Sequence, residues 1–369
     1  MKQNLIIKIA IVILAKLFSG KLEANEGQFF WPQWRGPTWN GVAIKADPPV
    51  TWDATKNVSW KVPIEGSGWG TPIVWDDRIF LLTAVAVDKK MPVPDVIPKG
   101  TPNINLHPQV IRSWKPQKFL ILCIDRTNGS LLWRRIVLEA MPHQGHHRKG
   151  GFASASPVTD GKYIYAYFGS FGLYCYDFEG RFVWKKIFEP QAMEDSLGEG
   201  SSPAIYGDKL IIVVDHELQS YVVAIDKRTG KEIWKSDRDE ISNWSTPRIY
   251  THDDRRKVVV NGETVRSYDL VTGELVWKCG GHTASAIPMP AVGHGLVFTA
   301  SGWKKDALQA IAEGIDKMYA EEFICLVEDL ENKRAPWMCS LPLNDPMRVD
   351  EFEFLSLIHI SEPTRRYAI

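Results

Sequence analysis

The 369-residue sequence has no excess of charge of either sign, since 44 lysines and arginines balance 44 aspartates and glutamates. Proteins that bind nucleic acid or anionic lipid carry a concentrated basic surface, because attraction to phosphate groups dominates their affinity. This composition indicates no such surface. We therefore exclude nucleic acid as the expected partner.

Several catalytic signatures are missing as well. The sequence contains no nucleophile elbow and no Ser-His-Asp order of the kinds that hydrolases use. Glycine-rich stretches such as residues 66–70 lack the strand-to-helix context of a phosphate-binding loop. Neither a hydrolase nor a nucleotide-binding enzyme is indicated.

Cysteines are few and far apart, at Cys123, Cys175, Cys279, Cys325 and Cys339. Five cysteines in an exported chain invite a search for disulfides, but their positions argue against one. Cys123 and Cys175 each lie two residues before an aspartate of the repeat described below. We expect them at matching positions on sheets packed ~10 Å apart. A disulfide needs Cα atoms within ~7 Å of each other, so both thiols should be free.

No apolar run is long enough for a confident membrane span. The N-terminus instead has Lys2, an apolar stretch over residues 5–14 that contains one lysine, and a small-residue cleavage site at residues 22–24. This order predicts a secretory signal peptide over residues 1–24, with an uncleaved anchor as the alternative. We expect an exported protein, periplasmic or extracellular, without a transmembrane span in the mature chain.

Aromatic residues are abundant, with 15 tryptophans, and several of them belong to a repeat of about 45 residues. Each copy has an apolar stretch, an aspartate, a glycine and then a tryptophan. Such a unit predicts a β-hairpin in which aspartate caps the turn, glycine supplies a positive φ and the next strand leads to a buried tryptophan. The four copies are Asp125, Gly129 and Trp133; Asp177, Gly180 and Trp184; Asp226, Gly230 and Trp234; and Asp269, Gly273 and Trp277.

A second marker, a short motif that ends in proline, lies between these units. Proline is tolerated at the first residue of a strand, so each motif is expected to open the inner strand of a sheet. Four short strands per period are typical of a β-propeller blade, with a solenoid as the alternative. The copies are Thr71-Pro72, Ser156-Pro157, Ser202-Pro203, Thr246-Pro247 and Met289-Pro290, with Ser340-Leu341-Pro342 as a looser sixth.

These patterns predict an all-β chain folded as a β-propeller of four-stranded antiparallel blades, truncated after about five complete blades and the start of a sixth. Residues 58–61 are expected to form a closing strand, and residues 304–322 to be helical or irregular. The expected organisation is a signal peptide (1–24), an N-terminal extension (25–49), a partial propeller (50–354) with an insertion loop at 84–118, and a tail (355–369) that resembles a translated sequencing adapter.

Residues 31–37, Trp-Pro-Gln-Trp-Arg-Gly-Pro, resemble the opening signature of exported propeller-repeat proteins of planctomycete-type bacteria, a group similar to pyrroloquinoline-quinone-binding repeat proteins. The stretches 153–184 and 200–302 resemble the same group, and the likeness covers roughly residues 29–350. The resemblance implies a quinoprotein-dehydrogenase-like propeller. It implies little about chemistry, because folds of this kind host many functions.

Residues just before the strand-opening prolines are equivalent by repeat, so we expect them around one mouth of the axial channel. They combine aromatic, hydroxyl, amide and acidic groups on loops of small residues, which suits a sugar, a peptide segment or the edge of a protein. The alternative is that Trp69 and Trp244 only pack between blades. The candidate binding residues are Trp69, Ser154, Glu199, Ser201, Asn243, Trp244 and His282.

A histidine-rich loop contains His143, His146 and His147, which are weak candidates for a zinc or copper site. No cysteine or carboxylate lies within a few residues of them, and Arg148 and Lys149 would repel a cation. We therefore expect a polar loop between blades rather than a metal site.

The resemblance to quinone-dependent dehydrogenases implies a cofactor in the central funnel, clamped by a vicinal disulfide and an aromatic floor, with calcium held by carboxylate and amide oxygens. The sequence has no adjacent cysteine pair, although Glu199, Asn243 and Asp215 are possible oxygen ligands. No cofactor is therefore predicted, and pyrroloquinoline quinone with calcium is the alternative.

The sequence as a whole predicts an extracytoplasmic, non-catalytic propeller that binds or scaffolds a protein or carbohydrate partner. In this it is similar to the propeller that scaffolds outer-membrane barrel assembly. The alternative is a quinone-dependent oxidoreductase acting on alcohols or sugars. No catalytic residue is expected in the first case.

Overall fold

The computed structural model describes residues 30–43, 46–89, 91–92, 96–99, 101, 109–113, 115–280, 282, 284–293, 295–301, 322–329 and 337–342. The expected signal peptide, the expected tail at 355–369 and nearly all of the stretch 304–322 lie outside these residues. Within the described part, no helix is long and apolar enough to cross a membrane.

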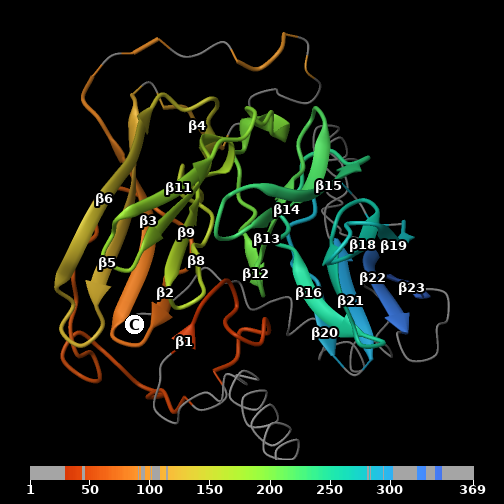
Figure 1. Ribbon diagram of the computed structural model, residues 1–369, viewed down its shortest axis with the longest axis horizontal. Coiled ribbons are helices and arrows are strands. Elements are labelled where there is room, and N and C mark those ends of the chain that lie inside the picture. The colour runs from red at the N-terminus through yellow and green to blue at the C-terminus, as the bar shows by residue number, and fades with distance from the viewer. Residues whose placement is uncertain are drawn as a thin grey trace, which may run out of the picture.

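Five antiparallel sheets contain most of the described strands, and in each sheet the strands are paired in chain order (Figure 1). The first strands of the first four sheets contact one another in succession, which places them at the inner edge. The chain is therefore a β-propeller of four-stranded antiparallel blades, and the predicted fold class is confirmed.

The strand bounds follow the repeat. The first blade contains β2 (Ile73–Trp75), β3 (Arg78–Ala86), β5 (Gln117–Asp125) and β6 (Leu131–Ala140), and β1 (Phe30–Trp31) pairs with β2. The second contains β8 (Val158–Thr159), β9 (Tyr163–Tyr167), β10 (Leu173–Asp177) and β11 (Phe182–Lys186), and the third β12 (Ala204–Tyr206), β13 (Lys209–Val214), β14 (Ser220–Asp226) and β15 (Glu232–Arg238). The fourth contains β16 (Arg248–His252), β17 (Arg255–Val260), β18 (Val265–Asp269) and β19 (Leu275–Cys279), and the fifth β20 (Ala291–Gly293), β21 (Leu296–Ser301), β22 (Glu322–Asp329) and β23 (Trp337–Pro342). Outside the blades are β4 (Val110–Ile111), β7 (His146–His147) and two short 3-10 turns, η1 (Gly169–Phe171) and η2 (Glu194–Ser196).

The second blade is buried on both faces by its neighbours, which explains why its strands are nearly continuous apolar runs in the sequence. Successive side chains of a strand point to opposite faces. In β10, Tyr174 and Tyr176 pack in a core shared with the first blade, whereas Leu173 and Cys175 pack in a core shared with the third. Cys175 and Cys123 are buried and free, and burial raises the pKa of the Cys123 thiol to about 12.

The outer strands of neighbouring blades meet through a tryptophan and a glycine. Nε1 of Trp184 donates a hydrogen bond to the carbonyl oxygen of Lys227 (3.1 Å), the residue after the repeat aspartate of the next blade. A Cβ added to Gly230 would lie 2.5 Å from Cε3 of Trp184, and the φ of Gly230 is +72°. Glycine is required here both for the backbone conformation and for the space under the indole.

The same contact recurs around the described blades. Nε1 of Trp133 donates to the carbonyl oxygen of Phe178 (2.7 Å), and Nε1 of Trp234 donates to that of Leu270 (3.1 Å). Trp184 and Trp234 are each 8% exposed, whereas Trp133 is partly buried. Trp277 is also partly buried, but its Nε1 donates to the hydroxyl of Tyr250 instead (3.1 Å).

A hydroxyl ladder joins the inner strands and accounts for the second sequence marker. The backbone N–H of Thr71 donates to Oγ of Ser156 (2.8 Å), and the N–H of Ser156 donates to Oγ of Ser202 (2.9 Å). The N–H of Ser202 in turn donates to Oγ1 of Thr246 (3.1 Å). At three successive blade boundaries, the residue before the strand-opening proline is thus tied to its equivalent in the next blade.

The N-terminal segment 30–41, expected to lie outside the propeller, crosses the inner strands. Beyond β1, the carbonyl oxygen of Pro32 accepts a hydrogen bond from the N–H of Thr159 (2.9 Å). The carbonyl oxygen of Thr38 accepts one from Nη1 of Arg248 (3.1 Å), whose guanidinium lies over the ring of Trp39. The segment therefore connects the first blade to the fourth.

Three boundaries differ from the sequence expectation. The β3 strand continues to Ala86 and β5 begins at Gln117, so the insertion occupies only the connection between them.

Ser340–Pro342 ends β23 instead of opening a sixth blade. Proline is tolerated at this position because β23 is an edge strand. Residues 58–61, expected to form a closing strand, form no strand and pair with none of the described strands. Trp60 nevertheless covers Gly129 and donates from Nε1 to the carbonyl oxygen of Arg126 (2.9 Å).

The glycine under the indole can be tested with a matched pair of substitutions. Gly207 also has a positive φ, +59°, but nothing lies within 4 Å of a Cβ built there. We expect Gly207→Ala to cost about 1 kcal/mol of unfolding free energy from backbone strain alone. Gly230→Ala should cost about 1–3 kcal/mol more, because the indole of Trp184 must move. Urea unfolding of both variants measures the difference, and equal costs would contradict this account.

Trp60 should stabilise the propeller although it belongs to no strand. Its indole repeats the contact between blades, so Trp60→Ala should lower the unfolding free energy by about 2–3 kcal/mol, less than for a fully buried tryptophan. Trp52, which is 49% exposed, is the control, and Trp52→Ala should cost less than about 0.5 kcal/mol. Comparable losses for the two variants would show that Trp60 has no special role.

Candidate functional site

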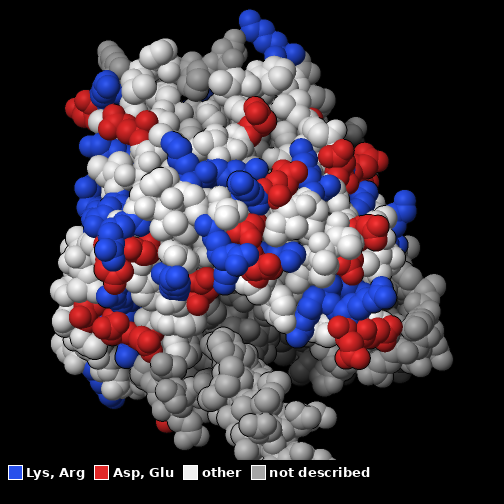
Figure 2. Space-filling model, in the orientation of Figure 1, with Lys and Arg blue, Asp and Glu red and all other residues white. Residues whose placement is uncertain are grey.

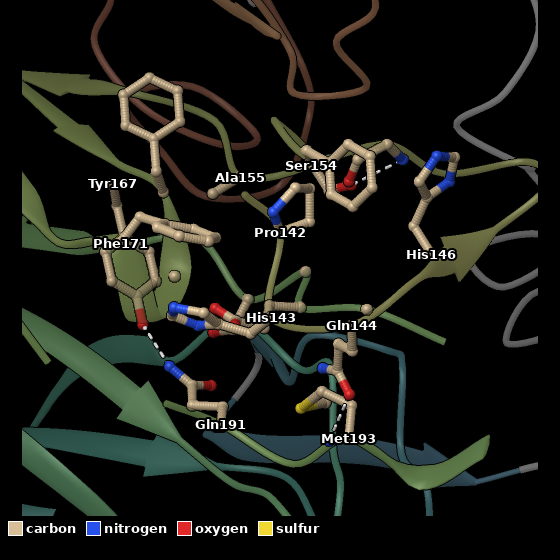
Figure 3. A pocket seen from close by; sticks show the side chains of 18 of the residues that line it. Pro142, His143, Gln144, His146, Ser154, Ala155, Tyr167, Phe171, Gln191 and Met193 are labelled. Carbon is tan, nitrogen blue, oxygen red and sulfur yellow. Dashed lines mark hydrogen bonds between the residues drawn. The ribbon is translucent and has the colours of Figure 1, made fainter. Parts of the chain in front are cut away.

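A partly open pocket lies among the loops that precede the inner strands of the second to fourth blades (Figure 3). Four of the candidate binding residues, Ser154, Glu199, Ser201 and Asn243, line it. The remaining side chains come from the connection between the first two blades, from η1 and the end of β9, from the segment between the second and third blades, and from the loop that follows β13. They include Pro142, His143, Gln144, His146, Phe152, Tyr167, Phe168, Phe171, Gln191, Met193 and Asp215.

Glu199 is held against the η1 turn. The backbone N–H of Ser170 donates to Oε2 of Glu199 (2.5 Å), and Oγ of Ser170 donates to Oε1 (2.6 Å). A Cβ on Gly169 would overlap the carboxylate, so this approach requires glycine. Burial raises the pKa of Glu199 to about 7, and the two hydrogen bonds from Ser170 lower it only in part. The carboxyl group therefore titrates near neutral pH.

His143 lies beside the same serine. Its ring stacks on Phe171 with centroids 4.2 Å apart, as Figure 3 shows, and its Nδ1 is 2.9 Å from Oγ of Ser170. Burial lowers the pKa of His143, so the ring is neutral in the folded protein at neutral pH. Glu199, Ser170 and His143 thus form a chain of hydrogen bonds along one wall of the pocket.

The three histidines of the predicted polar loop have different partners. Nδ1 of His146 is 2.7 Å from the carbonyl oxygen of His147, and Nε2 of His147 is 2.6 Å from Oε1 of Gln109. Among the described residues, no group of three or more histidines, cysteines or carboxylates is placed to hold a metal ion. The loop pairs through β7 with β4 and so connects the insertion of the first blade to the pocket wall.

Asp215 and Asn243 belong to a buried polar network. Arg238 donates from Nε and Nη2 to the two carboxylate oxygens of Asp215 (2.8 and 3.0 Å), and both side chains are fully buried. Burial alone would lower the pKa of Arg238, but Asp215 raises it above its ordinary value, so the guanidinium stays charged. Oδ1 of Asn243 accepts the N–H of Ala286 (2.7 Å), and its Nδ2 donates to Asp215 and to Glu240. Asn243 therefore ties the fourth blade to the fifth.

The other predicted residues lie around or behind the pocket. Trp69 is 47% exposed and covers Gly151 of the pocket wall, while Trp244 covers Gly200 and donates from Nε1 to the carbonyl oxygen of Gly198 (2.6 Å). His282 is buried and does not line the pocket, and burial lowers its pKa to about 4.

Sequence reasoning missed the side chains that come from η1 and β9. Nε2 of Gln191 donates to the hydroxyl of Tyr167 (3.3 Å), and these two face each other in Figure 3. The sequence does contain a signal for this turn, since two glycines interrupt an aromatic-rich stretch around Ser170. Glycines that flank a serine between two strands indicate a turn with space for another group.

The residues do not fit pyrroloquinoline quinone with calcium. The carboxylate oxygens of Asp215 are bound by Arg238, Oδ1 of Asn243 accepts a backbone N–H, and both oxygens of Glu199 face Ser170. In the part of the chain that the structure describes, no group of three or more histidines, cysteines or carboxylates is placed to hold a metal ion. In addition, no lysine or arginine is among the described residues that line the pocket, whereas this quinone carries several carboxylates.

Replacing Glu199 with glutamine should change how stability depends on pH. Because its pKa in the folded protein is about 7 and its ordinary value is 4.5, the folded state binds the proton more tightly than the unfolded state. That contribution is fully present below about pH 4.5 and is lost as pH rises through 7. The neutral Glu199→Gln variant lacks this pH-dependent contribution. As pH rises across this range, the unfolding free energy of the variant should therefore increase relative to that of the wild type, by up to about 3 kcal/mol.

Urea unfolding at pH 5, 6, 7 and 8 measures this gain. Glu232→Gln, on the outer strand β15 and away from the pocket, is the matched control and should show no such trend. A constant difference between Glu199→Gln and the wild type at every pH would contradict the raised pKa.

Distantly similar structures were found by comparison with solved proteins. BamB from Moraxella catarrhalis is 14% identical, and the match covers 71% of this chain and 65% of that one with a TM-score of 0.39. Quinohemoprotein alcohol dehydrogenase from Comamonas testosteroni is 11% identical over 76% and 46% of the two chains, with a TM-score of 0.42. The quinohemoprotein alcohol dehydrogenase ADHIIG from Pseudomonas putida HK5 is 11% identical over 77% and 43%, with a TM-score of 0.40. The chain thus spans less than two thirds of the length of each.

The family assignment depends on the repeats instead, since these TM-scores are below 0.5. No curated protein sequence matches this chain significantly. The family model described as outer membrane protein assembly factor BamB matches residues 117–278 and residues 218–315. The two matches overlap and together include more than half of the chain. The chain therefore belongs to the propeller-repeat family of the outer membrane protein assembly factor BamB.

Proposed function

We propose that this chain is an extracytoplasmic, non-catalytic β-propeller that binds a partner protein across the face that carries the pocket. The family supports a location outside the cytoplasm, because its description names an outer membrane assembly factor. The N-terminal pattern over residues 1–24 points the same way.

The observation that carries the proposal is the exposed Trp69 beside the pocket. An indole that is 47% exposed in a loop held by two backbone hydrogen bonds to Ala153 is pre-organised, and tryptophan is enriched among residues that dominate binding energy. Two further exposed apolar side chains, Leu218 and Ile287, lie on loops that follow β13 and precede β20. A protein edge would cover such separated apolar groups better than a single sugar ring does.

Charge on the face that Figure 2 shows gives no competing interpretation. Figure 2 shows lysines and arginines intermixed with aspartates and glutamates on the viewed face, without a large patch of one sign. Mixed charge supports solubility and does not attract nucleic acid. The pocket face is therefore the better candidate for a specific partner.

Site-specific cross-linking tests this proposal. A photo-reactive amino acid at position 69 of the full chain, expressed in its own cells, should form a discrete adduct with one protein. The same group at Leu132, an exposed position on β6, is the matched control and should not form it. For a partner captured this way, Trp69→Ala should weaken binding about tenfold or more. Identical adducts from both positions, or an adduct only with a polysaccharide, would refute a protein partner at this face.

The quinone-dependent oxidoreductase is the competing function. The purified chain, supplied with pyrroloquinoline quinone and calcium, is expected to show no dye-linked oxidation of alcohols or sugars. Asp215 is paired with Arg238, Oδ1 of Asn243 accepts a backbone N–H, and no lysine or arginine of the described pocket lining could bind the carboxylates of the quinone. Saturable, calcium-dependent turnover would overturn the binding proposal.

A further inference from the structure

Glu199 and Asp215 line the same pocket but differ in their partners. Asp215 forms a two-point ion pair with Arg238, which neutralises it. Glu199 has only the neutral donors of Ser170, and no ion pair of the described residues includes it. No lysine or arginine belongs to the described lining of the pocket. When ionised, Glu199 is thus a buried negative charge without a counter-ion, which is costly.

The carboxylate can still accept hydrogen bonds. Each carboxylate oxygen has two lone-pair sites, and each oxygen of Glu199 uses one for Ser170. The second site of each oxygen is left for another donor. Because Glu199 belongs to the pocket lining, a ligand in the pocket is the group that could provide that donor.

Four aromatic rings line the same pocket as this acid. Phe152, Tyr167, Phe168 and Phe171 all line the pocket, and Tyr167 and Phe168 are almost fully buried. The face of an aromatic ring attracts a cation, the more strongly when water is excluded. His143 does not take the place of such a cation, because burial lowers its pKa and keeps it neutral. A carboxylate beside aromatic rings, without a basic side chain, is complementary to an organic cation.

We propose that this pocket binds an alkylammonium group, with Glu199 as its counter-ion and the aromatic rings around its methylene chain. The group is either a lysine side chain of the partner protein or a small primary amine. This inference deepens the proposed function, on which it rests, by naming the chemistry that the partner brings to the pocket.

Binding of a cation should be coupled to the proton on Glu199. Since the pKa of Glu199 is about 7 without a ligand, the carboxyl is mostly protonated at pH 5.5, and an ammonium ion must displace that proton. The other titratable groups of the pocket are Tyr167, His143, His146 and the Asp215–Arg238 pair. Burial raises the pKa of Tyr167 well above 10, so it does not titrate in this range. Affinity should therefore rise by about tenfold per pH unit below pH 7.

Isothermal titration calorimetry of the full chain tests the inference with two probes. Butylammonium represents a small amine, and N-acetyl-lysine methylamide represents a lysine residue of a partner. Both should bind at pH 8 and at least tenfold more weakly at pH 5.5, with proton release at pH 6.5 when buffers of different ionisation enthalpy are compared. The neutral analogues, butanol and N-acetyl-norleucine methylamide, should bind at least tenfold more weakly than the amines.

Substitutions assign the binding to Glu199. Glu199→Gln should reduce the affinity for both amines at least tenfold at pH 8, whereas Glu232→Gln should leave it unchanged. The near-ultraviolet circular dichroism spectrum establishes that each variant is folded. Tighter binding of the lysine derivative than of butylammonium assigns the natural ligand to a protein, and the reverse order assigns it to a small amine.

Three results would overturn the inference: no amine binding by the folded wild type, equal binding of amines and neutral analogues, or unchanged amine binding by Glu199→Gln. None of them bears on the cross-linking at position 69. If that adduct forms while the amines fail to bind, a partner still occupies the face but does not insert a cation. If neither occurs, the proposed function fails as well.

Discussion

The contact between a tryptophan of one blade and the glycine turn of the next is the constraint on which the rest of the structure depends. A small sheet with two apolar faces is stable in water only when both faces are covered. Trp184 over Gly230 sets the spacing and alignment of the second and third sheets at their outer edge. The apolar side chains of the second and third sheets then pack together in one core at that spacing. Because Trp133 and Trp234 repeat the contact, each blade is placed by its neighbour, as in other repeat proteins.

The inner edge follows a different principle, since polar groups rather than rings hold it together. The hydroxyls of Ser156, Ser202 and Thr246 accept backbone N–H groups across blade boundaries, and Asp215 with Arg238 braces the loops behind them. Buried polar groups must be paired, and these pairs hold the loops in one arrangement. The pocket is thus built on rigid loops that the ladder positions, while the chain segment 30–41 crosses the inner strands.

Two carboxylates of the pocket, Asp215 and Glu199, have different partners. Asp215 is paired with its arginine, whereas Glu199 is held only by the neutral donors of Ser170. In the proposed function such a site binds by charge complementarity, and its described lining includes no lysine or arginine for an anionic quinone. Fold alone does not separate a binding propeller from an enzyme, because folds of this kind host many functions.

The sequence by itself determined the blades and their hairpins. Asp226, Gly230 and Trp234 predict a turn from their spacing alone, because turn geometry depends on backbone conformation within a few residues. Repeat equivalence also brought Ser154, Glu199, Ser201 and Asn243 to one face, and all four line the pocket. Only the tertiary structure decided what those side chains do. Ser170 meets Glu199 from another loop, Arg238 pairs with Asp215, and Trp60 covers the glycine turn of the first blade without being in a strand. Such contacts join residues distant in the chain, and they arise only when stacked sheets bring their loops around a common axis.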